Sequence, residues 1–333
     1  MVNTSQKPRI AITMGDPAGV GPELCLRLLA DSEITDLCTP IIFGSAGLLR
    51  RVGITCELEF DYPTATIESL NSSSELEGPF IIDVKGLESD AVVPGVVNAN
   101  TGQGSFDFIE AAIKAAQEGT IDAVVTGPIN KEAWDAAGIA FPGHTELFAD
   151  RCDTQRFCMM MYSPAFSCSL VTTHIGYLDV PGEMTTQRIT EVIELSNAAI
   201  KKIERREATL TVLGLNPHAG EKGLFGNREE ERLIEPAIEA AQKKGFKISG
   251  PLPPDTGFLT KHRQQTDVYI CMYHDQGLIP FKAFNFDTGV NVTLGLPMVR
   301  TSVDHGTALD IAWKGTADPA SLRAAVRLAA KLA

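Results

Sequence analysis

Three of the six histidines in this chain follow short apolar runs that lie in separate segments. They are His174 after residues 168–173, His218 after 209–215 and His274 after 268–273. Such runs are typical of buried strands in a parallel sheet, and ligands of these sheets bind at the carboxyl ends of the strands. Three imidazoles at one edge could hold a divalent metal with open coordination positions. A single histidine after a strand is more often a polar loop residue, so the metal hypothesis depends on all three, with Asp275 beside the last.

The composition limits the class of protein. A length of 333 residues suggests one large or two moderate domains. The formal net charge of −13 argues against nucleic acid or an anionic membrane as partner, but not against a small anion. Seven cysteines without a C-x-x-C pair indicate reduced thiols. Because we find no signal-peptide pattern and no apolar run near the ~18 residues of a membrane span, we expect a cytoplasmic protein.

Strand-like and helix-like segments alternate along the chain, which predicts an α/β fold with a largely parallel sheet. The clearest segments are strands over 9–13 and 121–125 and helices over 22–30, 105–118 and 186–203. A further helix is expected to begin at Asn227 and to be kinked at Pro236. Its acidic residues 229–231 match the helix dipole, so we interpret them as a solvated helix start.

Glycine-rich polar loops are the remaining candidates for chemistry, since G-x-x-x-x-G-K-[ST], G-x-G-x-x-G and G-x-S-x-G are all absent. The loops are 15–23, 126–131, 142–146, 216–221, 274–277 and 304–310. Turn geometry alone explains any one of them. Glycines also let a backbone approach a ligand, and successive N–H groups can hold phosphate oxygens. Lys282, Asn291 and Arg300 lie in one stretch of the chain. Together with the glycine-rich loops, they favour a phosphorylated substrate.

Seven of the chain's motifs occur in an order that closely resembles a known family. The motifs are 13–23, 126–131, 143–146, 215–221, 250–256, 273–278 and 300–308. Together they resemble the 4-hydroxythreonine-4-phosphate dehydrogenases, the PdxA family of vitamin B6 synthesis, over residues 8–330. The segment 305–315 also resembles the adenosine-binding loop of isocitrate and isopropylmalate dehydrogenases. The resemblance implies a two-domain fold of that type with an active-site cleft between the domains. We expect residues 1–130 with 285–333 in the first domain and 131–284, with the metal histidines and dimer contacts, in the second.

The resemblance also implies roles for individual residues. The metal ligands would be His174, His218 and His274, holding zinc, cobalt or magnesium, with part of the set supplied by the partner of a homodimer. The substrate-binding residues would be His144, Thr145, Lys282, Asn291 and Arg300. The NAD-binding residues would be His305, Gly306, Thr307 and Asp310, where the Asp310 carboxylate would favour the ribose hydroxyls of NAD over a 2′-phosphate. Candidate proton acceptors are Asp255, Asp275 and Lys131, each of which could instead orient a histidine.

The reaction implied by the resemblance is NAD-dependent oxidation of 4-phosphooxy-L-threonine at C3. Decarboxylation would follow and release 3-amino-2-oxopropyl phosphate and carbon dioxide. The nearest alternative is a paralogous dehydrogenase of D-erythronate or D-threonate 4-phosphate. A metal-dependent hydrolase would leave the Asp310 loop without a purpose. A non-catalytic phosphate-binding protein would need neither this loop nor three histidines.

Overall fold

The computed structural model describes residues 7–70, 78–285 and 288–333, which belong to two compact units. Unit 1 comprises Met1–Asp153 and Pro297–Ala333, and unit 2 comprises Thr154–Leu296. The sequence predicts that the chain leaves the first domain near residue 130 and returns to it near residue 285. In the structure these two points fall at 153–154 and 296–297, so the candidate substrate residues His144 and Thr145 belong to unit 1.

The sheet of unit 1 is parallel throughout, with strand order β3-β4-β2-β1-β5-β12. Its strands are β1 (Arg9–Thr13), β2 (Thr39–Gly44), β3 (Thr64–Ala65), β4 (Phe80–Asp83), β5 (Ala123–Thr126) and β12 (Val299–Ser302). The central strands are almost continuously buried because helices cover both faces of a parallel sheet. The predicted strand over 9–13 is confirmed, and the one predicted over 121–125 begins at Ala123.

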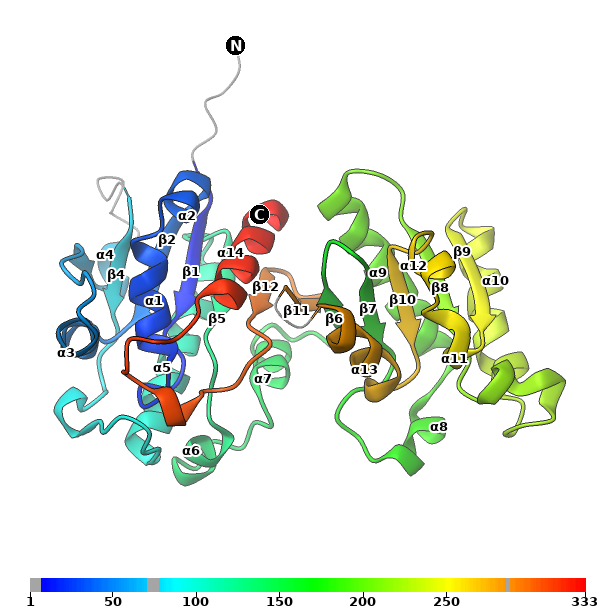
Figure 1. The fold of residues 1–333 in the computed structure, drawn as a ribbon, viewed down its shortest axis with the longest axis horizontal. Coiled ribbons are helices and arrows are strands. Elements are labelled where there is room, and N and C mark those ends of the chain that lie inside the picture. Colours follow the sequence, from blue (N-terminus) through cyan, green and yellow to red (C-terminus); the bar gives the residue numbers. More distant parts are fainter. Residues whose placement is uncertain (1–6, 71–77, 286–287) are drawn as a thin grey trace, which may run out of the picture. The chain divides into compact units, whose positions relative to one another are not determined.

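The helices of unit 1 flank this sheet. They are α1 (Gly21–Leu29), α2 (Ser32–Leu37), α3 (Ala46–Cys56), α4 (Ile67–Leu70), α5 (Ala99–Gln117), α6 (Lys131–Ala136), α7 (His144–Arg151) and α14 (Ala320–Leu332). Helix α5 begins earlier than the predicted Ser105, because Asn98 caps it and forms a capping box with Thr101. The C-terminal helix α14, red in Figure 1, packs on β12, β5 and β1.

The sheet of unit 2 is mixed, with strand order β11-β6-β7-β10-β8-β9. Its strands are β6 (Cys158–Tyr162), β7 (Ser167–Leu170), β8 (Thr209–Leu213), β9 (Lys247–Leu252), β10 (Val268–Cys271) and β11 (Val290–Leu294). Strands β7, β10, β8 and β9 run parallel, whereas β6 is antiparallel to both β7 and β11. The predicted α/β class with a largely parallel sheet is therefore confirmed.

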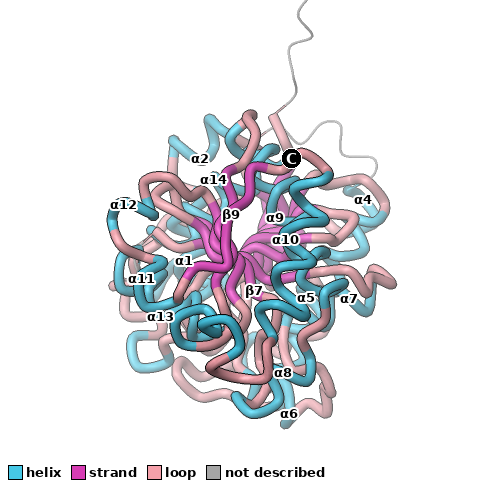
Figure 2. The backbone as a smooth tube through the Cα atoms, turned by 90° about the vertical axis from the view of Figure 1, so that its right-hand side faces the viewer, coloured by secondary structure: helices cyan, strands magenta, loops and turns pink. Residues whose placement is uncertain are grey.

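The helices of unit 2 include α8 (Val180–Glu183), α9 (Thr186–Glu204), α10 (Glu235–Lys243), α11 (Pro254–Gly257), α12 (Thr260–Arg263) and α13 (His274–Asn285). Helices α9 and α10 lie side by side (Figure 2). A π-helical segment, Glu230–Ile234, precedes α10, so Pro236 stands in the first turn of α10, where its missing N–H costs little. No helix in the described part of the chain is both long and apolar enough to cross a membrane.

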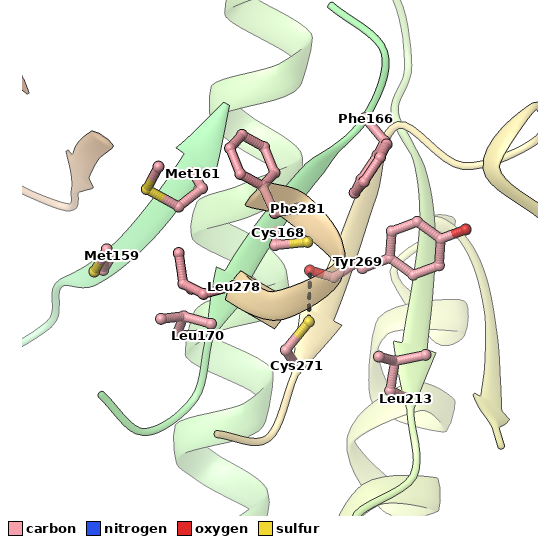
Figure 3. Close-up of a cluster of buried hydrophobic side chains, with 10 residues drawn as sticks. All are labelled: Met159, Met161, Phe166, Cys168, Leu170, Leu213, Tyr269, Cys271, Leu278 and Phe281. Carbon is pink, nitrogen blue, oxygen red and sulfur yellow. Dashed lines mark hydrogen bonds between the residues drawn. The ribbon is translucent and has the colours of Figure 1, made fainter. Parts of the chain in front are cut away.

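A cluster of buried side chains in unit 2 fixes the helix that begins with His274. Leu278 and Phe281 of α13 pack against side chains of β6, β7 and β10 (Figure 3). Burying Phe281 contributes about 1.5–3 kcal/mol relative to leaving it exposed. Gly277 permits the close packing, since an added Cβ would lie 3.0 Å from the Cys271 sulfur. The hydrophobic core thus holds α13, and His274 is the first residue of this helix.

Candidate functional site

Two of the three predicted metal-binding histidines lie close together in unit 2. His174 follows β7 and His274 follows β10, and these strands are parallel neighbours whose carboxyl ends lie at one edge. The centres of the two imidazole rings are 5.7 Å apart. Both rings line a pocket of about 530 Å³. Its lining residues are Thr173, His174, Ile175, Tyr177, Val180, Tyr273, His274 and Asp275.

The imidazole of His274 is oriented by its neighbour. Nδ1 of His274 lies 2.7 Å from Oδ1 of Asp275. A carboxylate that binds one ring nitrogen sets the tautomer and leaves the other nitrogen for a ligand, as in many metal sites. The imidazole donors of His174 and His274 are of a type that suits a divalent metal, with Asp275 behind the second ring. In this geometry Asp275 has the orienting role that the sequence left open for it.

His218 does not join the other two histidines within the described chain. Strand β10 lies between β7 and β8, so the strand before His218 is about 10 Å from the strand before His174. His218 is exposed in a 3₁₀ segment, Pro217–Gly223, whose backbone is left-handed from His218 to Lys222. Among the described residues no three His, Cys, Asp or Glu side chains are placed to hold a metal. A shared three-histidine site thus stays a prediction.

The loop that carries His218 is held by two buried carboxylates. The exposed fractions of Glu229 and Glu230 are 4% and 1%, so the prediction of a solvated helix start was wrong. Asn216 donates from its main chain to Glu230 (2.8 Å) and from its side chain to Glu229 (2.9 Å). The helix-dipole argument predicted acidic residues at this position but carried no information about burial. Both carboxylates instead fix the chain two residues before His218.

Gln276, which the sequence motifs did not single out, connects the ends of β10 and β8, and Thr172 adds the end of β7. Gln276 is buried, accepts a hydrogen bond from the Met272 N–H and donates one to the Gly214 carbonyl, both at 2.7 Å. Thr172 donates its hydroxyl to the Met272 carbonyl at 2.7 Å. The ends of β7, β10 and β8 are thereby held to one another. The only signal in the sequence was a glutamine beside the His274-Asp275 pair.

Arg300 is the centre of a second group, which lies in unit 1. It stands in β12, is only 2% exposed and donates to the Thr126 hydroxyl at 2.7 Å. Its guanidinium carbon lies 5.6 Å from the centre of the Phe148 ring. Burial lowers the pKa of Arg300 to about 10, and Glu146 opposes this shift. The guanidinium therefore remains a fixed cation at neutral pH.

His144 belongs to the same group and begins α7. Its Nε2 is buried and has no hydrogen-bond partner among the described residues. Burial, and then the positive charges of Arg300 and Lys131, lower the pKa of His144 well below its ordinary value. A neutral imidazole with a free nitrogen thus lies near two cations, with Thr145 next in the first turn. This arrangement suits an anionic, hydrogen-bonding ligand.

The other predicted substrate and proton-transfer residues lie on separate elements. In unit 2, Lys282 is partly exposed on α13, and Asn291 stands in β11 with a buried Oδ1 that has no partner in the described chain. Asp255 is exposed in α11, which packs against the segment of His218. Lys131 is exposed at the start of α6 in unit 1.

The predicted dinucleotide loop follows β12. Thr307 is buried, whereas Gly306 and Asp310 are exposed. The His305 Nε2 is buried without a partner in the described chain, and no atom would contact a Cβ at Gly306 within 4 Å. These features fit a dinucleotide that would approach the loop from the solvent side. They are the open space at Gly306, the ring nitrogen of His305 and the exposed carboxylate of Asp310.

The glycine-rich loop 15–23 has a different role from the phosphate binding that its composition favoured. It is buried throughout, and the main-chain N–H groups of Asp16, Gly19 and Val20 donate to carbonyl groups of unit 1. Asp16 donates to the Pro128 carbonyl (2.8 Å) and Val20 to the Thr307 carbonyl (3.0 Å). A Cβ at Gly21 would lie 2.0 Å from the Met14 carbonyl oxygen, so glycine is required there for packing.

The fold is that of an α/β protein with two groups of polar side chains, and similarity to known proteins specifies the class and the family. The family model described as pyridoxal phosphate biosynthetic protein PdxA matches residues 36–329. A 4-hydroxythreonine-4-phosphate dehydrogenase of Desulforapulum autotrophicum is 42% identical, covering 98% of this chain and 96% of the relative. A putative D-threonate 4-phosphate dehydrogenase of Oceanobacillus iheyensis is 41% identical, covering 99% of both chains.

A solved structure gives the same result. The crystal structure of 4-hydroxythreonine-4-phosphate dehydrogenase from Klebsiella pneumoniae matches with a TM-score of 0.86 and 38% identity, covering 99% of both chains. The chain therefore belongs to the PdxA family, and it is a dehydrogenase. This membership leaves the hydrolase and the non-catalytic binding protein without support.

Proposed function

We propose that this chain oxidises 4-phosphooxy-L-threonine at C3 with NAD and a divalent metal. Decarboxylation follows and yields 3-amino-2-oxopropyl phosphate and carbon dioxide, a step of pyridoxal 5′-phosphate synthesis. The observation that carries the proposal is the His174–His274 pair, with Asp275 bound to the second ring, in a chain of this family. The name of the Desulforapulum relative supports the choice of substrate.

Histidine side chains would hold the metal, which we expect to be zinc, cobalt or magnesium. His174 and His274 supply two nitrogen donors from one chain. His218 would complete the set across the interface of a cytoplasmic homodimer, because it does not reach the pair within its own chain. Neutral imidazoles leave the charge of a bound cation uncompensated. The chemistry that these side chains lack would come from the bound groups, with Lewis acidity from the cation and hydride acceptance from NAD.

Some of the proposed substrate-binding residues belong to unit 1 and others to unit 2. In unit 1, Arg300 offers a cation that is already fixed by Thr126, and His144 and Thr145 offer hydrogen-bonding groups beside it. Lys282 and Asn291 would contribute from unit 2. Because Arg300 and its surroundings are ordered before the substrate arrives, little conformational entropy is lost on binding.

The hydroxyl proton requires an acceptor, for which Asp255, Asp275 and Lys131 are the candidates. Asp275 is engaged with the His274 ring, so we assign it to orienting that ring. Asp255 is exposed beside the segment of His218, and Lys131 is exposed in the group of His144. We therefore propose that the proton is accepted by Asp255 or Lys131.

NAD would bind to the loop that contains His305, Gly306, Thr307 and Asp310. The exposed Asp310 carboxylate can accept hydrogen bonds from ribose hydroxyls and would repel a 2′-phosphate, which favours NAD over NADP.

A second candidate function rests on the other relative. The D-threonate 4-phosphate dehydrogenase of Oceanobacillus is 41% identical, nearly the same value as for the Desulforapulum enzyme. A D-threonate or D-erythronate 4-phosphate dehydrogenase would use the same metal, phosphate and dinucleotide groups. The two functions differ at C2 of the substrate, which carries an amine in the first and a hydroxyl in the second.

The deciding experiment follows NADH formation with 4-phosphooxy-L-threonine, D-threonate 4-phosphate and D-erythronate 4-phosphate, each with and without a chelator. Turnover of the amino acid alone, abolished by the chelator, would support the proposed function. Turnover of a sugar acid alone would establish the second candidate. Turnover that persists in the chelator would refute the metal requirement.

A further inference from the structure

A buried ion pair lies beneath the predicted dinucleotide loop. Glu23 and Arg27 are one turn apart on α1, and the Arg27 Nε donates to Glu23 Oε1 at 3.0 Å. The Glu23 side chain has no exposed surface, whereas 27% of the Arg27 side chain is exposed. A buried carboxylate is costly unless all its oxygens are bonded, so its partners indicate what it does.

The partners of this pair are main-chain groups at the end of the loop. Glu23 accepts hydrogen bonds from the N–H groups of Gly315 (3.1 Å) and Ala317 (2.9 Å). Arg27 donates to the carbonyl of Gly315 at 2.6 Å. Both polar groups of the Gly315 main chain are therefore bound by charged side chains, which are stronger partners than neutral ones.

The residues just before Glu23 hold the rest of the same loop. Val20 donates to the Thr307 carbonyl at 3.0 Å, and the Trp313 ring nitrogen donates to the Pro17 carbonyl at 3.2 Å. The loop is thus attached at Thr307, Trp313 and Gly315. Asp310 lies between the first two of these points.

The conformation of the loop explains why it needs these attachments. Ala308 and Trp313 have left-handed φ angles of 43° and 58°. Such angles are unfavourable for residues with side chains and persist only where the surroundings impose them. A loop released from α1 would relax to other conformations, and the exposed Asp310 carboxylate would move with it.

We propose that Glu23 and Arg27 are positioning residues for dinucleotide binding, which hold the 304–317 loop in the conformation that presents His305 and Asp310. The inference rests on the proposed use of NAD by this loop. Affinity falls in proportion to the fraction of molecules in the competent conformation. If release leaves about a tenth of the loops competent, NAD binding weakens ~10-fold.

The test compares Glu23→Gln and Arg27→Ala with the unsubstituted full-length protein by calorimetric titration with NAD. Both variants are expected to bind NAD ~10-fold more weakly and to show a raised KM for NAD with little change in kcat. A role in folding alone would lower Tm and leave the NAD affinity of the folded protein unchanged. Asp31→Asn is the matched control, because Asp31 also pairs with an arginine, Arg323, and accepts from a main-chain N–H, but at the N-cap of α2.

The outcomes separate this inference from the proposed function. Unchanged NAD affinity in folded Glu23→Gln and Arg27→Ala would overturn the inference and leave the proposed function intact. An unsubstituted protein that does not bind NAD would overturn both. If Glu23→Gln does not fold, the NAD affinity of Arg27→Ala alone tests the inference, because the Arg27 side chain is partly exposed.

Discussion

The arginine group of unit 1 and the histidine pair of unit 2 are built in opposite ways. Arg300 is 2% exposed, stands within a strand and is already hydrogen-bonded. His174 is exposed on a loop, and His274 is partly exposed at a helix start. Arg300 already has a hydrogen bond and a ring contact within unit 1, whereas the described residues of unit 2 bring only two histidines together beside the pocket. The contacts of Arg300 are already made within one chain, whereas we propose that a metal at the histidine pair takes a further ligand from another segment.

The largest effect is expected from His274→Ala, because it removes one of only two clustered nitrogen donors. Turnover should fall ~10³-fold or more, and bound metal should be lost. Elemental analysis of the purified variant and steady-state rates measure both quantities. His262→Ala in α12 is the control in the same unit and should retain metal and turnover. If the His274→Ala variant retained its full metal content, His274 would not be a metal ligand.

A smaller effect is expected from Arg300→Lys, which keeps the charge but loses the forked guanidinium. Charge-assisted hydrogen bonds contribute about 1.5–3 kcal/mol, so KM for the phosphorylated substrate should rise roughly 10- to 100-fold. Metal content should not change, since the metal ligands are proposed in unit 2. The control Arg151→Lys alters an exposed ion pair with Glu110 and should have little effect. An unchanged KM would show that Arg300 has only a structural role.

Gln276→Ala tests whether the open histidine pair depends on the connection between strand ends. The variant leaves the Met272 N–H and the Gly214 carbonyl without partners, which should cost about 2–4 kcal/mol of unfolding free energy in urea. Metal affinity should fall ~10-fold, as is typical when a group behind the ligands is lost. Gln242→Ala, which removes one hydrogen bond to Ile248, is the matched control. Undiminished metal affinity would refute the positional role.

The smallest effect concerns the pH dependence of His144. Because burial and neighbouring cations lower its folded pKa below the ordinary 6.5, the unfolded chain binds a proton that the folded chain excludes. The free energy of unfolding should therefore fall as pH drops below about 6.5, and this term is absent at higher pH. His144→Gln should reduce the loss of stability between about pH 7 and about pH 5, measured by urea unfolding. An identical loss in the variant would contradict a neutral His144.

Local patterns in the sequence predicted much of the fold. The strand over 9–13 and the helix over 186–203 were confirmed nearly to the residue, because period and burial follow from side-chain type. The helix predicted over 105–118 begins earlier, at Ala99, because of a cap at Asn98, a signal that the apolar spacing does not include. Burial of Glu229 and Glu230 was missed because it depends on Asn216, which is distant in the sequence.

The sequence by itself determined the residue types available for chemistry, the α/β class and the family, since each is carried by local motifs in order. Only the tertiary structure decided which of these residues meet. It brought His174 to His274 through neighbouring strands, left His218 apart and placed Glu23 beneath a loop almost 300 residues away. Such contacts arise from strand order and packing between distant segments, and no pattern within a single segment contains that information.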